Sequence, residues 1–140
     1  MSKKSPTCGQ LERDLSQQIQ AFYREQLGHQ PSKIICQLFE QKLVIIIENS
    51  ITSAEQLLAQ EGQDELAQEV RSSLEEVIKP KIRQLIETIL NVGVVDLLSD
   101  ANLETGRTGI IAVLTDTPQV RNLEAIAKVS SPRSPSANSK

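Results

Sequence analysis

The chain has one histidine, His29, which follows the first predicted helix. Paired with Cys36 or with an aspartate, it could form part of a nucleophile–base pair. A position just after a helix is more typical of an exposed turn residue, and we favour that interpretation. Cys8 lies 28 positions from Cys36, a spacing that fits no zinc or redox motif. We therefore expect two reduced thiols, as is usual in the cytosol.

The sequence D-A-N-L-E-T-G, which begins at Asp100, has acidic or amide side chains at alternate positions, as a calcium-binding loop does. The glycine of such a loop belongs at the sixth position, but Gly106 is at the seventh. The twelfth position should be a bidentate glutamate and is Ile111. We expect a polar hairpin loop in which Gly106 adopts a positive φ, and no metal site.

Other chemical motifs are weaker. Neither GxGxxG nor GxxxxGK[ST] occurs, so no nucleotide site of a known type is indicated. Carboxylate pairs at residues 64–65 and 75–76 fall on predicted helix surfaces, where adjacent side chains point apart. Basic residues on both sides of Pro80 could bind an anion, but they also suit the end of a helical segment, which we prefer. We predict no catalytic residue, no enzyme activity and no cofactor.

Composition limits the remaining classes of function. The 140 residues suffice for one domain, and the aromatic content of 2% predicts an aliphatic core. Residues 11–118 carry 17 Asp/Glu and 9 Lys/Arg, a net charge of −8. The two tails carry 1 Asp/Glu and 6 Lys/Arg, a net charge of +5. An acidic body with few aromatic residues disfavours nucleic-acid binding, because negative charge repels phosphate groups and few aromatic rings are present to stack on bases.

The first half of the chain predicts a helix and a β-hairpin. Apolar residues recur at spacings of three and four over residues 10–27, and Gly28 is placed to end that helix. Strands are expected at residues 33–39 and 42–48. Residues 43–47 are all apolar, and such a strand needs cover on both faces. We expect helices on one face and a second protomer on the other, hence a homodimer.

The second half predicts two helical segments and a second hairpin. Thr52 and Glu55 form a capping box that begins a short helix. The helical period resumes over residues 64–91, and Pro80 within this stretch must kink or restart the helix. The last two strands and the loop between them are expected at residues 92–99, 109–115 and 100–107.

These elements predict a two-layer α+β domain. Its four-stranded antiparallel sheet is built from elements that follow one another along the chain as hairpin, helix and hairpin. An N-terminal helix and a long Pro-interrupted helix pack on this sheet. The domain is expected over residues 10–118, with a disordered tail at 1–9 and a mostly disordered tail at 119–140. No stretch approaches the ~18 apolar residues of a membrane span, and no signal peptide is visible. We expect a cytoplasmic protein.

Four segments resemble the MpsC-like family, small bacterial proteins named after a proposed sodium-translocating, membrane-potential-generating system. They are LGHQP at 27–31, ITSAEQLL at 51–58, the helix from Val70-Arg71 through Lys79-Pro80 to Leu85-Ile86, and Ser99-Asp100 with Thr105-Gly106. The likeness spans about three quarters of the chain and depends on the order and spacing of the segments. Gln30 departs from it, because the family tends to have glycine there.

The resemblance implies an α+β fold and an accessory role at a membrane. We expect a non-enzymatic regulatory or adaptor protein that binds another protein, such as a membrane ion or bicarbonate transport complex, at the inner membrane. The alternative is a small-ligand or anion sensor with its site near residues 100–107. For a ligand site, the resemblance indicates Arg71, Asp100, Thr105 and Gly106.

Overall fold

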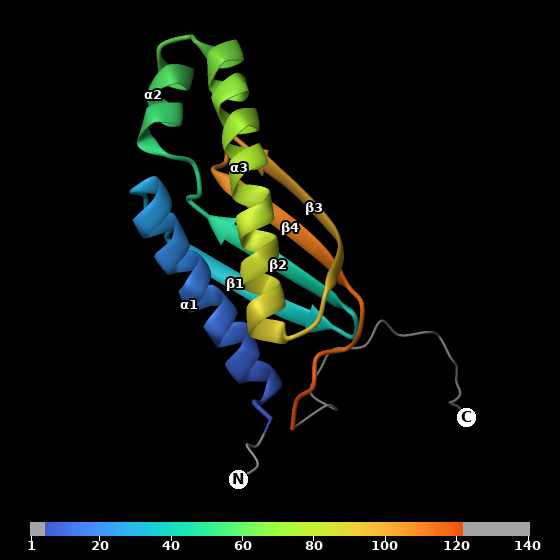
Figure 1. Cartoon of the computed structure of the whole chain (residues 1–140). Coiled ribbons are helices and arrows are strands. Elements are labelled where there is room, and N and C mark those ends of the chain that lie inside the picture. The colour runs from blue at the N-terminus through green and yellow to red at the C-terminus, as the bar shows by residue number, and fades with distance from the viewer. Residues whose placement is uncertain (1–4, 122–140) are drawn as a thin grey trace, which may run out of the picture.

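Two β-hairpins, separated along the chain by two helices, form one antiparallel sheet in the computed structural model, which describes residues 5–121 (Figure 1). The strand order is β1-β2-β4-β3, so the two hairpins meet where β2 pairs with β4. The elements are α1 (Cys8–Leu27), β1 (Lys33–Phe39), β2 (Lys42–Glu48), α2 (Ser53–Gln60), α3 (Asp64–Leu90), β3 (Val94–Asn102) and β4 (Arg107–Leu114). The predicted two-layer α+β architecture is therefore confirmed.

The helical layer covers one face of the sheet. In Figure 1, α1 and α3 lie side by side across that face, while α2 and the beginning of α3 extend past one end of the strands. The core is aliphatic, as the composition predicts, and Tyr23 is its one buried aromatic residue among those described. Its inward residues on the central strand, Leu43, Ile45 and Ile47, are all 0% exposed.

Local signals explain where most elements begin and end. The side chain of Thr52 accepts a hydrogen bond from the amide of Glu55, whose carboxylate accepts one from the amide of Thr52, so the predicted capping box is confirmed. Gly28, at φ 61°, ends α1 in the left-handed region as expected. The first hairpin matches its predicted strands at every boundary, and Glu40 adopts the positive φ in its turn.

Several boundaries differ from the prediction, and among them β3 begins at Val94 instead of residue 92. A capping box at Thr7 starts α1 at Cys8, so the helix takes in residues assigned to the N-terminal tail. Helix α3 runs through Pro80 as a single element. Of the two expectations for Pro80, the helix therefore continues past it and does not end and begin again there. The strands β3 and β4 take in residues 100–102 and 107, which leaves a turn of only 103–106 where an eight-residue loop was expected. Residues 1–4 and 122–140 of the predicted tails lie outside the described residues.

The free edge of β1 is covered by polar side chains of α1. Glu12 Oε2 accepts a hydrogen bond from the amide of Leu38 at 2.9 Å, and Ser16 Oγ donates to the carbonyl of Ile34 at 3.2 Å. One turn further, Gln20 Nε2 donates to the carbonyl of Pro31, just before the strand. A spacing of four places these side chains on one helix face. They satisfy an edge that would otherwise be open to pairing with another chain.

Candidate functional site

A buried ion pair joins α2 to α3. Arg71 is 4% exposed, and Glu55 is fully buried. The guanidinium donates from Nε to Glu55 Oε2 at 2.7 Å and from Nη2 to Glu55 Oε1 at 2.8 Å, a bidentate pairing. Nη1 reaches Glu75 Oε2 at 3.2 Å, one helical turn further along α3. Two carboxylates thus neutralise this arginine from within the protein.

Burial and charge act in opposite directions on this cluster. Burial alone would lower the pKa of Arg71, but the hydrogen bonds and charge of Glu55 outweigh it, so the pKa is raised and the side chain stays charged. Tyr23 lies beside the cluster. Burial raises the pKa of Tyr23 to about 12, although the positive charge of Arg71 opposes the shift. The cluster therefore keeps a charged arginine and a neutral phenol inside the helical layer.

The same arginine is connected to the β3–β4 turn through Ser50. Arg71 Nη2 lies 3.5 Å from the carbonyl of Ser50, at the limit for a hydrogen bond. Ser50 donates from its amide and its hydroxyl to the carbonyl of Gly106, at 2.8 and 3.0 Å, and its Oγ lies 2.7 Å from Thr108 Oγ1. Gly106 has φ 77°, as predicted for this turn. The connection fixes the turn against the start of α2.

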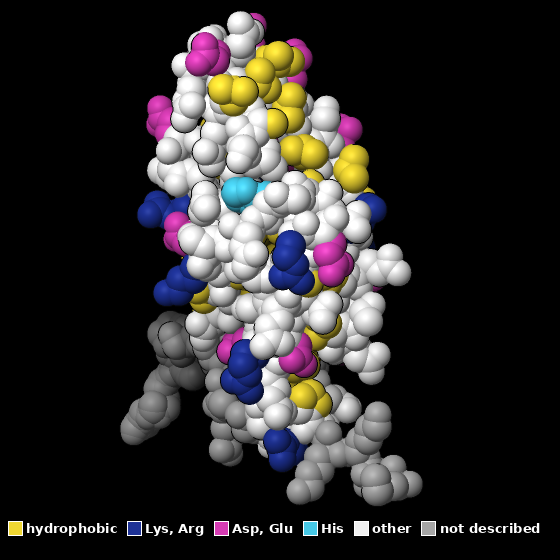
Figure 2. Space-filling view, turned by 90° about the vertical axis from the view of Figure 1, so that its left-hand side faces the viewer, with side chains coloured by type: hydrophobic (Ala, Val, Ile, Leu, Met, Phe, Trp, Pro, Cys, Tyr) yellow, Lys and Arg dark blue, Asp and Glu magenta, His cyan; other side chains and the backbone are white. Residues whose placement is uncertain are grey.

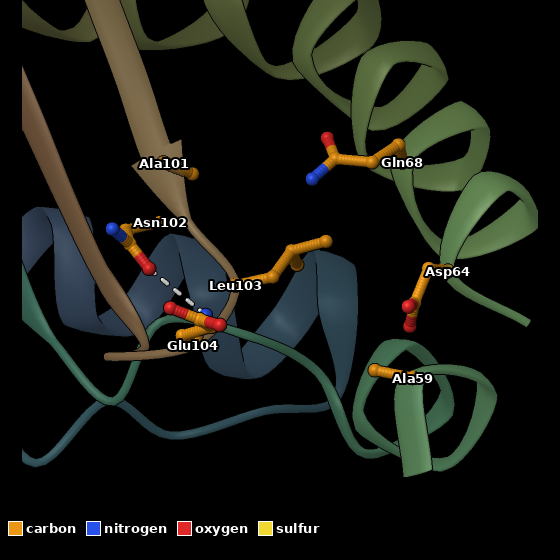
Figure 3. Close-up of a pocket in the computed structure, with 7 residues that line it drawn as sticks. All are labelled: Ala59, Asp64, Gln68, Ala101, Asn102, Leu103 and Glu104. Carbon is orange, nitrogen blue, oxygen red and sulfur yellow. Dashed lines mark hydrogen bonds between the residues drawn. The ribbon is translucent and has the colours of Figure 1, made fainter. Parts of the chain in front are cut away.

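A hollow of about 580 Å³ lies between this turn and the helical hairpin formed by α2 and α3. In Figure 3, Gln68 and Leu103 extend into it from opposite sides, and Asp64 and Ala59 lie at its helical end. Asn102 Oδ1 accepts from the amides of Glu104 and Thr105, so its side chain shapes the turn. The charged side chains lining this hollow, Asp64 and Glu104, are both acidic.

The four residues suggested for a ligand site do not converge on one pocket. Arg71 is buried in its ion pairs and does not line the hollow. Asp100 is exposed on β3, where it pairs with Gly109. Thr105 and Gly106 build the turn itself through backbone contacts. Arg71 and Gly106 are linked through Ser50, and this link holds the β3–β4 turn against the start of α2.

Residues 101–104 of the hollow lie in the segment that the sequence indicated for a sensor site, whereas the residues of its helical side were not expected to contribute. Asp64 and Gln68 are spaced by four, which places them on one face of α3. That spacing alone could not show that the face meets residues 102–104, because the meeting depends on the angle of the helical hairpin. The apolar period of the first helix likewise gave no sign that Glu12 binds the edge of β1 or that Gln20 binds the carbonyl of Pro31 just before it.

The histidine and the two cysteines, which the sequence offered as candidate reactive residues, are held by contacts within the fold. His29 is half-buried, and its Nε2 lies 2.6 Å from the carbonyl of Asn49. Cys8 and Cys36 are both buried, and burial raises the pKa of each thiol to about 11. Within residues 5–121, no group of three or more His, Cys, Asp or Glu side chains is placed to hold a metal ion. No helix in that part of the chain is long and apolar enough to span a membrane.

Comparison with known proteins gives a family. No curated protein and no solved structure matches the chain significantly. A profile of the MpsC family, described as a Na+-translocating membrane potential-generating system, matches residues 7–116. The match begins at the N-cap of α1 and ends just after β4, so it spans the whole two-layer domain. The chain belongs to the MpsC family.

Proposed function

We propose that this protein is a non-enzymatic adaptor that regulates a membrane potential-generating system by binding one of its membrane proteins. The observation that carries the proposal is the surface of the helical hairpin formed by α2 and α3. Leu57 and Val77 are each 57% exposed, and Leu66 is 43% exposed. Figure 2 shows hydrophobic side chains gathered on the upper part of the molecule, over this hairpin. Exposed apolar side chains that gather on one part of a surface are typical of protein-binding sites.

The charge around these apolar residues favours a basic partner. Residues 53–76 contain seven Asp/Glu and one Lys/Arg. That one cation is Arg71, which is buried and paired, so the exposed charge of the hairpin is negative. Cytoplasmic loops of membrane proteins carry an excess of lysine and arginine. A basic loop with apolar anchors would therefore complement this surface, and binding it would place the protein at the inner face of the membrane.

The test is capture from solubilised membranes of the native host, with bound proteins identified by mass spectrometry. We expect the wild-type chain to retain an integral membrane protein with basic cytoplasmic loops, and Leu57→Ser with Leu66→Ser to lose it. Val95→Ser, which alters an equally exposed apolar residue at the start of β3, is the control and should retain it. Recovery of the same membrane proteins by the wild type and the double variant would refute the proposal.

Ionic strength gives a second readout. Because the hairpin is acidic, capture should weaken as salt concentration rises, and Glu65→Gln with Glu69→Gln should reproduce that weakening at low salt. A salt-independent interaction would show that the acidic residues do not contribute.

A small-ligand sensor is the alternative, favoured by the hollow beside the β3–β4 turn. Its acidic lining disfavours an anion, and Arg71 already has two carboxylate partners. Thermal-shift measurements with nucleotides, bicarbonate and divalent cations would support a sensor if any ligand raised the Tm and Gln68→Ala removed the effect. No shift with any of them would eliminate these ligands.

A further inference from the structure

The face of the sheet opposite the helices has an apolar centre, which has no cover within the described part of the chain. Along each strand, the residues between the buried ones point to this open face. Ile46 on β2, Ile111 on β4 and Leu98 on β3 are 38%, 43% and 54% exposed. The apolar residues of the open face are Ile35, Phe39, Val44, Ile46, Leu98, Ile111 and Val113.

Charges divide the open face into two sides. The outer strand of the first hairpin and its neighbour carry Lys33 and Lys42, both exposed. The strand at the opposite edge carries Asp96 and Asp100, also exposed. Glu48 on β2 and Arg107 on β4 lie on the same face, but they form an ion pair with each other at 2.9 Å and so offset one another. One side of the apolar surface is therefore basic and the other acidic. This asymmetry determines which arrangements of a second copy are favourable.

We infer that the open face binds the open face of a second copy of this chain, about a two-fold axis that runs parallel to the strands. Such an axis exchanges the two sides of the sheet, so the β1 side of each protomer lies over the β3 side of its partner. Lys33 and Lys42 then face the acidic side of the other protomer. An axis perpendicular to the strands would place each side of one protomer over the same side of its partner. Like charges would then face each other.

The side-chain register supports the same axis. A rotation about an axis along the strands keeps each residue's position along the strand while exchanging β2 for β4. Ile46 and Gly109 are paired across these two strands. The bulky Ile46 of one protomer therefore lies over Gly109 of the partner subunit, and the reverse contact forms as well. A large side chain opposite a glycine, repeated by symmetry, allows the two sheets to approach closely.

The size of the face suits a reversible dimer. Four strands spaced ~4.8 Å apart, with about seven residues rising ~3.4 Å each, make a face of roughly 19 by 24 Å. Covering it on both protomers removes roughly 900 Å² or more from water, which approaches the ~1,000 Å² of the smaller specific interfaces. We therefore expect dimers at tens of micromolar and dissociation on dilution.

The remaining occupant to distinguish is the C-terminal segment of the same chain, residues 122–140. The described chain ends in the helical layer, where the amide of Arg121 donates to the carbonyl of Pro6 at 3.0 Å, just before α1. The segment would therefore have to pass around the domain to reach the open face. A second copy needs no such path.

The first test is the mass of the purified full-length chain in solution by size exclusion with light scattering. We expect a dimer for the wild type and a monomer for Ile111→Asp with an unchanged far-ultraviolet circular dichroism spectrum. Leu57→Asp, an equivalent change on α2, should remain dimeric. A monomeric wild type at tens of micromolar overturns the inference, and a dimer that appears only after deletion of residues 122–140 would assign the open face to that segment. Persistence of the dimer in both Ile111→Asp and Leu98→Asp also overturns it.

The second test determines the axis by cross-linking. Gln37 and Leu98 lie at opposite edges of one row, in which Gln37 pairs with Val44, Val44 with Ile111, and Ile111 with Leu98. A mixture of Gln37→Cys and Leu98→Cys protomers should form covalent dimers with a short thiol cross-linker, because the axis brings these positions together. Each variant alone should not, and the native cysteines are buried. Cross-linking of either variant with itself, but not of the mixture, overturns the proposed axis.

Discussion

The two faces of the sheet have similar apolar sequences and different surroundings. On β2, the alternate residues Leu43, Ile45 and Ile47 are completely buried under α1 and α3, whereas Ile46 is 38% exposed between them. The helical layer accounts for the first set. The fold of one chain does not account for the second, since a polar residue would serve an exposed strand position as well. We propose that the uniform hydrophobicity of this strand reflects two requirements, a core on one face and a binding surface on the other.

Arg71→Ala should give the largest effect on the covered side of the sheet. Removing the guanidinium leaves the buried carboxylate of Glu55 without its bidentate partner, and breaking such a pair typically costs about 3–5 kcal/mol of unfolding free energy. Chemical denaturation measures this loss.

The matched control replaces both partners, as Arg71→Met with Glu55→Gln, and should recover most of the stability because no buried charge remains at this pair and the Gln side chain can still accept from the Thr52 amide. A loss below about 1 kcal/mol for Arg71→Ala would show that solvent reaches the pair and that Arg71 is available to a ligand.

Ile45→Ala and Ile46→Ala compare the two faces within one strand. Ile45 is fully buried, so its truncation should cost about 2–5 kcal/mol of unfolding free energy, the usual range for a core isoleucine. Ile46→Ala should leave the stability of the monomer within about 1 kcal/mol and weaken self-association instead. Denaturation at a protein concentration below the dimer range, together with sedimentation equilibrium, separates the two effects. Equal losses of monomer stability would show that both faces belong to the core.

Alkaline pH should destabilise the covered side. Burial raises the pKa of Tyr23 from 10.0 to about 12 and that of Cys36 from 9.0 to about 11. The folded chain then holds these protons more tightly than the unfolded chain does. The stabilisation is complete below about pH 9 and is lost as pH rises toward 12, by up to ~1.4 kcal/mol per pH unit for each group.

Denaturation at a series of pH values tests this slope. Tyr23→Phe should flatten it between pH 10 and 12, because the phenol that titrates there is gone. A slope unchanged in both Tyr23→Phe and Cys36→Ala would show that other groups cause the alkaline loss.

Glu12→Ala should give a smaller effect, at the covered edge of the sheet. The variant removes the acceptor of the Leu38 amide and should cost about 1–2 kcal/mol, as expected for one charged hydrogen bond. It also exposes part of an edge that can pair with other chains, so aggregation on heating should increase. Asp14→Ala, on the same helix, is the control. Light scattering during thermal melts that is the same for both variants would contradict a protective role.

Sequence reasoning succeeded where a short-range pattern determines the structure. The Thr52–Glu55 capping box, the apolar period of α1 and the run over residues 43–47 each depend on near neighbours, and each predicted its element. Polar side chains whose partners are distant in the sequence could not be predicted in this way. Period alone cannot distinguish a glutamate that faces water from Glu12, which binds an edge strand 26 positions away.

The candidate site was harder to predict for the same reason. Arg71 was selected by resemblance, and only its contact with Glu55, 16 positions earlier, shows that it is a buried connector. The hollow between Gln68 and Leu103 depends on how the helical hairpin leans over the β3–β4 turn. No spacing in the sequence encodes that angle.

Concentration-dependent thiol labelling tests most directly whether the open face is a binding surface. Ile111→Cys places a reactive thiol at its centre, Leu57→Cys places one on α2, and both native thiols are buried. We expect labelling at position 111 to slow as the concentration of the purified protein rises, whereas labelling at position 57 should stay constant. Equal and concentration-independent labelling at the two positions would contradict this expectation.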